Sequence, residues 1–304
     1  MAKNILIAGA TGLIGQELVA QLQAKGHQVS ILVRKPTKKA GIKVFLWDVE
    51  RQQIDKDAFN GIDTVINLAG EGIADKPWNQ QRKQQIIDSR VKSTELLFKA
   101  IKESNAPVES YISASGVGYY GDREDEILDE ESSPGHDFMA HCCIEWEKAA
   151  DRGIALGIRV VKLRTGIVLS EKGGALATFE KSIKNFVGAA LGTGKQWLPW
   201  IHMDDLVNIY IKAVEDPSLF DAYNATAPSP VTNTTFTKTL AKILHRPVWP
   251  INVPKFVLKL ILGEMSILPL ISNNTSAQKI LNTGFQFRYL NLESALTAIY
   301  EQKK

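Results

Sequence analysis

A glycine-rich loop between a strand-like run and a helix-like run is the feature that most restricts how this chain can fold. Asn4–Ala8 (NILIA) is a continuous apolar run of the kind that forms a buried strand, and Gln16–Lys25 carries a helical pattern that stops at Gly26. The loop between them is Gly9–Gly15 (GATGLIG). A strand, a glycine loop and a helix in this order predict the first unit of a parallel α/β sheet.

Each glycine of the loop has a separate physical role in that context. Gly9 permits a tight turn, Gly12 lets the backbone approach a pyrophosphate, and Gly15 lets the helix pack close to the strand. The start of the helix then offers unpaired N–H groups and the positive end of its dipole to phosphates. We therefore predict a bound dinucleotide, the alternative being a glycine-rich turn without a ligand. The predicted contacts are Gly9, Thr11, Gly12, Leu13, Ile14 and Gly15.

Short apolar runs and longer helical patterns alternate through the first half of the chain, as they do in parallel sheets covered on both faces. Arg82–Glu103 predicts one long helix. Further strands are predicted at Gln28–Val33, Val44–Trp47, Thr64–Leu68, Ser110–Ala114 and Arg159–Leu163. The predicted fold class is α/β, a Rossmann-like doubly wound parallel sheet with a smaller, discontinuous C-terminal α/β lobe.

The composition of the chain changes after about Ser170, and this change sets the predicted domain boundaries. Residues 171–200 are rich in glycine and aromatic residues, Asp204–Glu215 has a helical pattern, and prolines surround an apolar helix at Lys255–Leu262. We predict a nucleotide-binding domain over residues 1–170, to which 200–225 return, and a capping lobe made of 171–199 and 226–304. The apolar helix suggests a membrane face, but eight residues are few, and burial against the sheet domain is the favoured expectation.

Composition narrows the class of protein. The 304 residues are 44% hydrophobic and 23% charged, which excludes disordered and collagen-like chains, and a net charge of +3 gives no reason to expect nucleic acid. The two cysteines, Cys142 and Cys143, are adjacent and cannot staple distant segments, which indicates a reducing cytoplasm. Without clustered histidines they are poor zinc ligands, so we predict no metal site and buried thiols rather than a nucleophile.

The residue that ends the second strand usually distinguishes NAD from NADP. Val33 is followed by Arg34 and Lys35, with Lys38 and Lys39 close behind, and the run contains no acid. A guanidinium suits a ribose 2′-phosphate, so the sequence favours NADP over NAD, the alternative being a solvated basic turn. Asp48, after the third strand, is placed either to meet the adenine edge or to be a surface carboxylate.

Several motifs together resemble the extended short-chain dehydrogenase/reductase superfamily. They are Gly9–Gly15, Asn67–Gly70 (NLAG), Ile112–Gly121 (ISASGVGYYG), Leu163–Ser170 (LRTGIVLS) and Trp200–Val207 (WIHMDDLV). The chain is more closely similar to the atypical branch called the epimerase family of the SDR39U1/YfcH type. The closer match lies in Ser89–Thr94, Gly135–Ala150, Gly192–Val207 and Leu262–Leu270.

The resemblance implies a doubly wound sheet, bound NADP and a small C-terminal domain at about 248–296. It also implies cofactor contacts at Leu68, Ala69, Gly70, Arg90 and Arg164. The superfamily's proton transfer uses a serine together with a tyrosine and a lysine four residues later on one helix. Ser115 falls at the serine position, but anchoring on Glu147 puts Met139 and Cys143 at the other two. Neither of them can act as that pair does, although an activated Cys143 thiolate could accept a proton.

Tyr119 and Tyr120 follow the serine strand and are the candidate replacements. We predict that one of them, with Ser115, contacts the substrate at the carboxyl edge of the sheet. The alternative is that one tyrosine is packed inside and the other is an aromatic residue on the rim.

Aromatic and polar residues of the later segments are candidates for the substrate site. Trp197 and Trp200, beside the turn Gly192–Gly194, could line a pocket for a planar or sugar-like group or could simply close the lobes. His202 borders the same cleft, either as a base or, as we favour, as an anchor for its loop. Asp204 could cap the following helix.

Two functions from different classes remain open at this stage. The leading hypothesis is a cytoplasmic NADP-dependent oxidoreductase or epimerase-like enzyme acting on a small molecule, such as a sugar nucleotide or another carbonyl or hydroxyl compound. The alternative is a non-catalytic NADP-sensing or regulatory protein, including a cell-division role, which the absent tyrosine–lysine pair favours. Neither a membrane nor a nucleic acid is expected as partner, and analogy suggests a homodimer through Arg82–Glu103 and Met139–Asp151.

Overall fold

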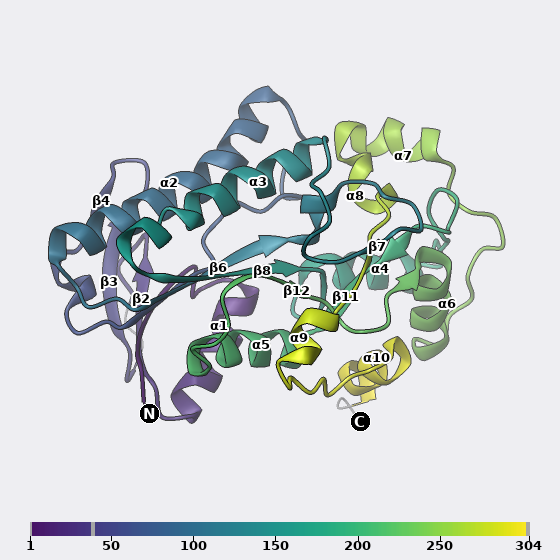
Figure 1. Cartoon of the computed structure of the whole chain (residues 1–304). Coiled ribbons are helices and arrows are strands. Elements are labelled where there is room, and N and C mark those ends of the chain that lie inside the picture. The colour runs from purple at the N-terminus through teal and green to yellow at the C-terminus, as the bar shows by residue number, and fades with distance from the viewer. Residues whose placement is uncertain (1, 38–39, 302–304) are drawn as a thin grey trace.

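The computed structural model describes residues 2–37 and 40–301, and one large sheet organises them (Figure 1). In the described chain this sheet has eight strands in the order β12-β8-β6-β5-β1-β2-β3-β4. The strands pair in parallel except β3 with β4. The chain moves outward from β1 to one edge and then returns to build the other half from β5, which confirms the doubly wound Rossmann-like class. The strands are β1 Asn4–Ala8, β2 Gln28–Val33, β3 Lys43–Asp48, β4 Gln53–Ile54, β5 Thr64–Asn67, β6 Ser110–Gly116, β8 Arg159–Thr165 and β12 Asp221–Ala225.

Helices cover both faces of the sheet (Figure 1). One face carries α1 (Leu13–Ala24) and α5 (Met203–Glu215), and the other carries α2 (Gln80–Ser104) and α3 (Phe138–Asp151). Successive side chains of a strand point to opposite faces, and β1 shows the consequence. Ile5 and Ile7 join the core under α1 and α5, whereas Leu6 and Ala8 join the core under α2. Burial on both faces explains why the strand is apolar at every position.

The helix ends follow local capping chemistry. The Asn79 side chain accepts the backbone N–H of Arg82 at 2.7 Å and starts α2, and Asn105, in the left-handed region at φ 50°, ends it. Asp137 caps α3 in the same way. The long helix therefore begins two residues before its predicted start and extends one residue further. α1 begins at Leu13 rather than Gln16 because the glycine loop leads directly into the helix.

A smaller group of elements packs around a third core that contains Trp200, with α4 (Gly174–Lys184), α6 (Asn233–Ile243) and α10 (Leu292–Glu301). Short strand pairs connect this group: β9 Ile167–Leu169 with β11 Trp200–His202, β10 Trp197–Leu198 with β13 Val231–Thr232, and β7 Ile127–Leu128 with β14 Asn274–Thr275. The remaining helices are α7 Lys255–Leu262, α8 Ile267–Leu270 and α9 Gln278–Asn282. Short 3₁₀ helices lie at Lys56–Phe59, Val117–Tyr120, Ile154–Leu156 and Gly263–Ser266.

The C-terminal part of the chain does not stay within that smaller group. Ile280, Phe285 and Phe287 are buried in the core beneath α1 and α5, together with residues of the large sheet. This part of 226–304 therefore returns to the nucleotide-binding side, a long-range contact that local sequence patterns do not indicate.

Helix α7 has the predicted bounds but not the predicted burial. Leu258 is 7% exposed, whereas Phe256, Leu260 and Ile261 are 72%, 85% and 70% exposed. The helix lies at the outside of the structure (Figure 1). The expectation that it is buried against the sheet domain is therefore wrong for most of its apolar side chains. None of the helices described in residues 2–37 and 40–301 has both the length and the apolarity needed to cross a membrane.

The exposure of α7 predicts a contrast between two leucine substitutions. Leu260→Ala should change the free energy of unfolding by no more than about 0.5 kcal/mol, because a surface side chain has few contacts to lose. Leu240→Ala should cost about 2–5 kcal/mol, because Leu240 is completely buried in the third core. Chemical denaturation of both variants measures the difference, and equal destabilisation would show that α7 is packed against other parts of the molecule in solution.

Candidate cofactor site

The glycine loop brings three backbone segments into close contact at the carboxyl edge of the sheet. Gly9 has φ +80°, and a Cβ atom there would lie 2.6 Å from the carbonyl carbon of Leu68, at the end of β5. A Cβ atom on Gly15 would lie 2.4 Å from the carbonyl oxygen of Gly9. These two positions therefore require glycine for the turn and for the packing of α1. Gly12 differs, because its φ is −76° and a Cβ atom would meet only the Gly9 oxygen, at 3.3 Å.

The beginning of α1 is suited to an anion. Within the described chain no side chain caps the helix at Gly12, and its first turn contains no acidic residue. The Gln16 side chain donates to the Thr11 carbonyl at 2.8 Å, which fixes the loop against the first turn of α1. Uncapped N–H groups and the positive end of the helix dipole together fit a phosphate. Leu13 and Ile14, in the first turn, are half-buried and fix the helix against the core.

Arg34 leaves the carboxyl end of β2 with a side chain that is 80% exposed. Its guanidinium lies 3.7 Å from a carboxylate oxygen of Glu71, across the edge of the sheet. Asp48, at the end of β3, accepts the backbone N–H of Arg51 at 3.0 Å, so this carboxylate closes its own turn. Lys38 and Lys39 lie outside the described residues.

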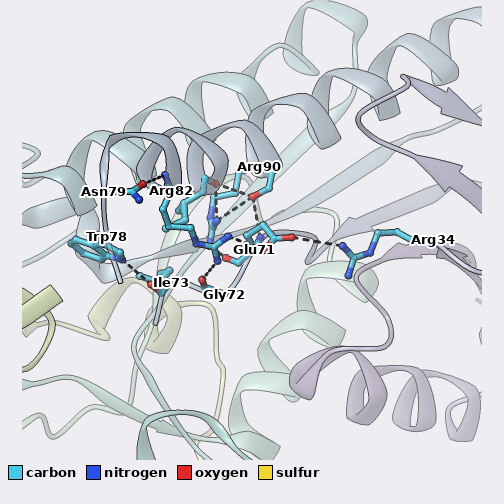
Figure 2. A network of polar contacts seen from close by, with 10 residues as sticks. Arg34, Glu71, Gly72, Ile73, Trp78, Asn79, Arg82 and Arg90 are labelled. Atoms are coloured by element: carbon cyan, nitrogen blue, oxygen red, sulfur yellow. Dashed lines mark hydrogen bonds and ion pairs between the residues drawn. The ribbon is translucent and has the colours of Figure 1, made fainter. Parts of the chain in front are cut away.

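The segment after β5 is fastened to α2 by a network of polar contacts (Figure 2). Arg82 donates to the Glu71 carboxylate at 3.1 Å and to the Gly72 carbonyl at 2.7 Å, and Ser89 accepts the Glu71 N–H at 3.0 Å. Arg90 donates to the carbonyls of Ile86 and Glu71 at 2.8 and 3.1 Å and is buried. These backbone contacts give Arg90 a structural role, and its role as a cofactor ligand stays a prediction.

The same network explains the glycine of the NLAG motif. A Cβ atom on Gly70 would lie 3.1 Å from the guanidinium carbon of Arg90, so a side chain there would crowd the arginine. Leu68 and Ala69 are fixed by main-chain contacts: the Leu68 N–H donates to the Ala8 carbonyl, and the Ala69 N–H to the Asn67 side chain. The predicted cofactor residues 68–70 therefore lie directly beside Gly9, on the same edge of the sheet.

Ser115, at the end of β6, is joined to a buried ion pair. Its hydroxyl donates to Glu147 at 2.7 Å, and Arg164 binds the same carboxylate through two nitrogen atoms at 2.9 Å each. All three residues are buried. Arg164 also stacks on Tyr119, with its guanidinium carbon 3.5 Å from the ring centre. These partners occupy the guanidinium of Arg164, and its implied cofactor contact stays a prediction.

The two candidate tyrosines are in different environments. Tyr120 is completely buried, its hydroxyl donates to Asn224 at 2.7 Å, and Arg164 donates to it at 3.1 Å. Burial raises the pKa of Tyr120 well above its ordinary value. Tyr120 is therefore packed inside the fold, the position that the alternative assigned to one of the two tyrosines, and its contact with a substrate stays a prediction. Tyr119 is half-buried and lines a cavity of about 410 Å³ together with Glu147 and Arg164.

Met139 and Cys143 face the segment that follows Ser115. A Cβ atom on Gly118 would lie 3.2 Å from the Cβ of Met139, and one on Gly116 would lie 3.7 Å from the Cys143 sulfur. Burial raises the pKa of the Cys143 thiol far above its ordinary value, so it is not an activated thiolate. Cys142 and Cys143 are both buried, free thiols. The two side chains predicted to stand at the superfamily's tyrosine and lysine positions are therefore unsuited to proton transfer.

The residues proposed for the substrate site differ in their burial and in their hydrogen-bond partners. Trp200 is completely buried in the third core and donates to the Ser229 carbonyl, and its contact with a substrate stays a prediction. Trp197 is half-buried and donates to Asp125 at 2.8 Å. His202 is buried, accepts the Asp204 N–H as the N-cap of α5, and stacks on Tyr289. These contacts fit the favoured alternative, an anchor for the loop, and place the cap at His202 rather than at Asp204.

Comparison with known proteins supplies the family. Residues 5–225 match the model of the NAD dependent epimerase/dehydratase family, and residues 253–299 match a domain of unknown function, DUF1731. The chain belongs to the NAD dependent epimerase/dehydratase family. The resemblance drawn from the motifs is thereby confirmed.

Proteins of similar sequence match over almost their whole length. The epimerase family protein YfhF of Bacillus subtilis is 36% identical, covering 99% of each chain. The chloroplastic SDR39U1 homolog of Arabidopsis thaliana is 37% identical over 98% of this chain and 87% of its own. The crystal structure of human epimerase family protein SDR39U1 (isoform2) with NADPH superposes with a TM-score of 0.87 at 31% identity, covering 98% of this chain and 99% of that one.

Three functional side chains were absent from the sequence-based prediction: Glu71, Arg82 and Glu147 as a partner of Ser115. Glu71 immediately follows the NLAG motif, which was a usable signal, because residues after a strand of a parallel sheet reach the ligand edge. Glu147 served only as an alignment anchor. Its contact with Arg164 joins α3 to β8 and cannot be found from local spacing.

The glycine geometry predicts opposite behaviour for two alanine variants. Gly15→Ala should lower the melting temperature markedly, because the new Cβ atom collides with the Gly9 carbonyl. Gly12→Ala should fold normally, because its nearest contact of 3.3 Å needs only a small shift. The variant should lose phosphate affinity, because the new Cβ atom lies where the backbone approaches the pyrophosphate. Thermal melts and cofactor titrations separate the two effects. A Gly12→Ala variant that binds a dinucleotide as well as the unmodified protein would argue against a ligand at this loop.

His202 predicts a pH effect on stability. Burial lowers the pKa of His202 below its ordinary value of 6.5. Between that lowered pKa and 6.5 the unfolded chain takes up a proton that the folded chain excludes, so the free energy of unfolding should fall as the pH drops below 6.5. Asparagine is a good helix cap that does not titrate, so His202→Asn should remove this part of the pH dependence. Denaturation at pH 7.5 and 5.5 tests both proteins, and identical slopes would show that His202 does not contribute.

Proposed function

We propose that this chain is an NADP(H)-dependent oxidoreductase or epimerase-like enzyme that acts on a small hydroxyl or carbonyl compound. The observation that carries the proposal is the uncapped, acid-free start of α1 behind Gly9 and Gly12, with Arg34 projecting from the neighbouring strand. The similarity to the human protein whose structure contains NADPH supports it.

The preference for NADP rests on Arg34. An exposed guanidinium at the end of β2 can make two parallel hydrogen bonds to a 2′-phosphate, whereas a ribose hydroxyl pair would call for a carboxylate at this position. Structures of the same fold that contain NAD are 20% identical or less and inform only the fold.

A nicotinamide cofactor supplies hydride transfer when bound. In this chain Gly9–Gly15 would hold its pyrophosphate, residues 68–70 would border it, and Ser115 and Tyr119 are the proposed substrate contacts. The Ser115 proton points to Glu147, which leaves its oxygen lone pairs as hydrogen-bond acceptors for a substrate hydroxyl.

A second candidate is a protein that binds NADP(H) without catalysis. It is favoured by Met139 and Cys143, which occupy the tyrosine and lysine positions with buried side chains that do not transfer protons. Incubation with either redox form and a panel of hydroxyl and carbonyl compounds discriminates the two. A net change in nicotinamide absorbance reports an oxidoreductase. Inversion of a substrate stereocentre without incorporation of solvent hydrogen and without net cofactor turnover reports an epimerase. Tight NADPH binding with neither result favours the sensor.

Titration with NADPH and NADH, followed by nicotinamide fluorescence, tests the cofactor site. Arg34→Ala should weaken NADPH binding by about 10–100-fold, because a charge-assisted pair to phosphate is lost, and should change NADH binding by less than about twofold. Lys25→Ala, at the far end of α1, is the matched control that removes one exposed positive charge. Equal loss of both cofactors in Arg34→Ala would contradict a 2′-phosphate site, and binding of neither by the unmodified protein would contradict the proposed function.

A further inference from the structure

Glu71 lies between two arginines that hold it unequally (Figure 2). One carboxylate oxygen is 3.1 Å from the guanidinium of Arg82, whose side chain is only 6% exposed. The other oxygen is 3.7 Å from the guanidinium of Arg34, whose side chain is 80% exposed. The first contact is short and partly buried and the second is long and solvated, so the pair with Arg34 is the weaker of the two.

The backbone around Glu71 is fixed, whereas Arg34 is not. Ser89 accepts the Glu71 N–H, Arg90 donates to its carbonyl, and Arg82 donates to the next carbonyl, that of Gly72. The Arg34 guanidinium pairs with the Glu71 carboxylate across the edge of the sheet. Glu71 is therefore a stationary negative charge, and Arg34 is the element that can change partner at little cost.

Resting on the proposed function, we propose that Glu71 determines cofactor specificity as the counter-ion that the ribose 2′-phosphate displaces from Arg34. A phosphate and the Glu71 carboxylate compete for one guanidinium, so the gain from the new contact is reduced by the loss of the old one. NADPH must therefore break the Arg34–Glu71 pair to gain its own contact. NADH has no such phosphate and binds with the pair in place.

In this arrangement Glu71 reduces the preference for NADPH over NADH without itself contacting the cofactor. It lowers the affinity for NADPH and leaves that for NADH unchanged, while the contact with Arg82 keeps the carboxylate in position. The opposite arrangement, in which Glu71 orients Arg34 to receive the phosphate, predicts the reverse sign for the same substitution.

Glu71→Gln removes the charge and retains a side-chain oxygen for Arg82. Fluorescence titration should show NADPH binding tightened by roughly two- to fivefold, the range expected when one exposed ion pair no longer competes, with NADH binding unchanged. Glu109→Gln is the matched control: Glu109 forms an exposed ion pair with Lys3 at the opposite edge of the sheet, and its substitution should alter neither affinity.

The double variant Arg34→Ala/Glu71→Gln completes the test. Once Arg34 is absent there is nothing to release, so adding Glu71→Gln to Arg34→Ala should not tighten NADPH binding further. Weaker NADPH binding by Glu71→Gln, an unchanged NADPH-to-NADH ratio, or equal tightening in the double variant would each overturn the proposal. A failure of the unmodified protein to bind NADPH would instead overturn the proposed function, so the two failures are distinguishable.

Discussion

The structure depends on a backbone contact that admits no side chain. At the carboxyl edge of the sheet, Gly9 touches the end of β5 at Leu68, and Gly15 touches the carbonyl of Gly9. These contacts hold the first helix close to the central pair of strands, and they direct its uncapped N-terminus to the point where the strand order reverses. In doubly wound sheets that point is where ligands bind. The phosphate site is thus a result of how tightly three backbone segments pack.

Much of the fold could be predicted because its strands and helices follow from the short-range periodicity of apolar residues. A continuous apolar run such as Asn4–Ala8 fits only a strand buried on both faces, and its bounds were obtained directly. Burial of α7 was the wrong inference from a correct pattern. Amphipathic spacing says that Phe256 and Leu260 share a face of the helix, but which face meets the protein is decided by tertiary packing.

The features of the candidate site that depend on position along the backbone could be predicted from the sequence. The features that depend on contacts between side chains distant in the sequence could not. The roles proposed for the glycines and Arg34 follow from their places at the ends of strands. Arg90, Arg164 and Tyr120 have motif positions that suggest ligand contact, yet each is satisfied internally by a partner distant in the sequence: a carbonyl of the loop after β5, Glu147 or Asn224. An arginine free to bind a phosphate and an arginine consumed by a buried carboxylate look identical in a sequence.

The buried pair of Glu147 and Arg164 bears on how a chain without the tyrosine and lysine keeps its site intact. Taking two charges out of water is costly unless their hydrogen bonds are complete, and here Ser115, Tyr120 and both carboxylate oxygens complete them. The network ties β6, β8 and α3 together beneath the positions of Met139 and Cys143. This framework is held by charges other than the side chains of Met139 and Cys143, the residues at the predicted tyrosine and lysine positions. Glu71, Arg82 and Arg90 perform the equivalent task for the loop after β5. The edge proposed to receive the cofactor is thus stabilised by ion pairs and backbone contacts on either side, and the guanidinium of Arg34 lies exposed beside it.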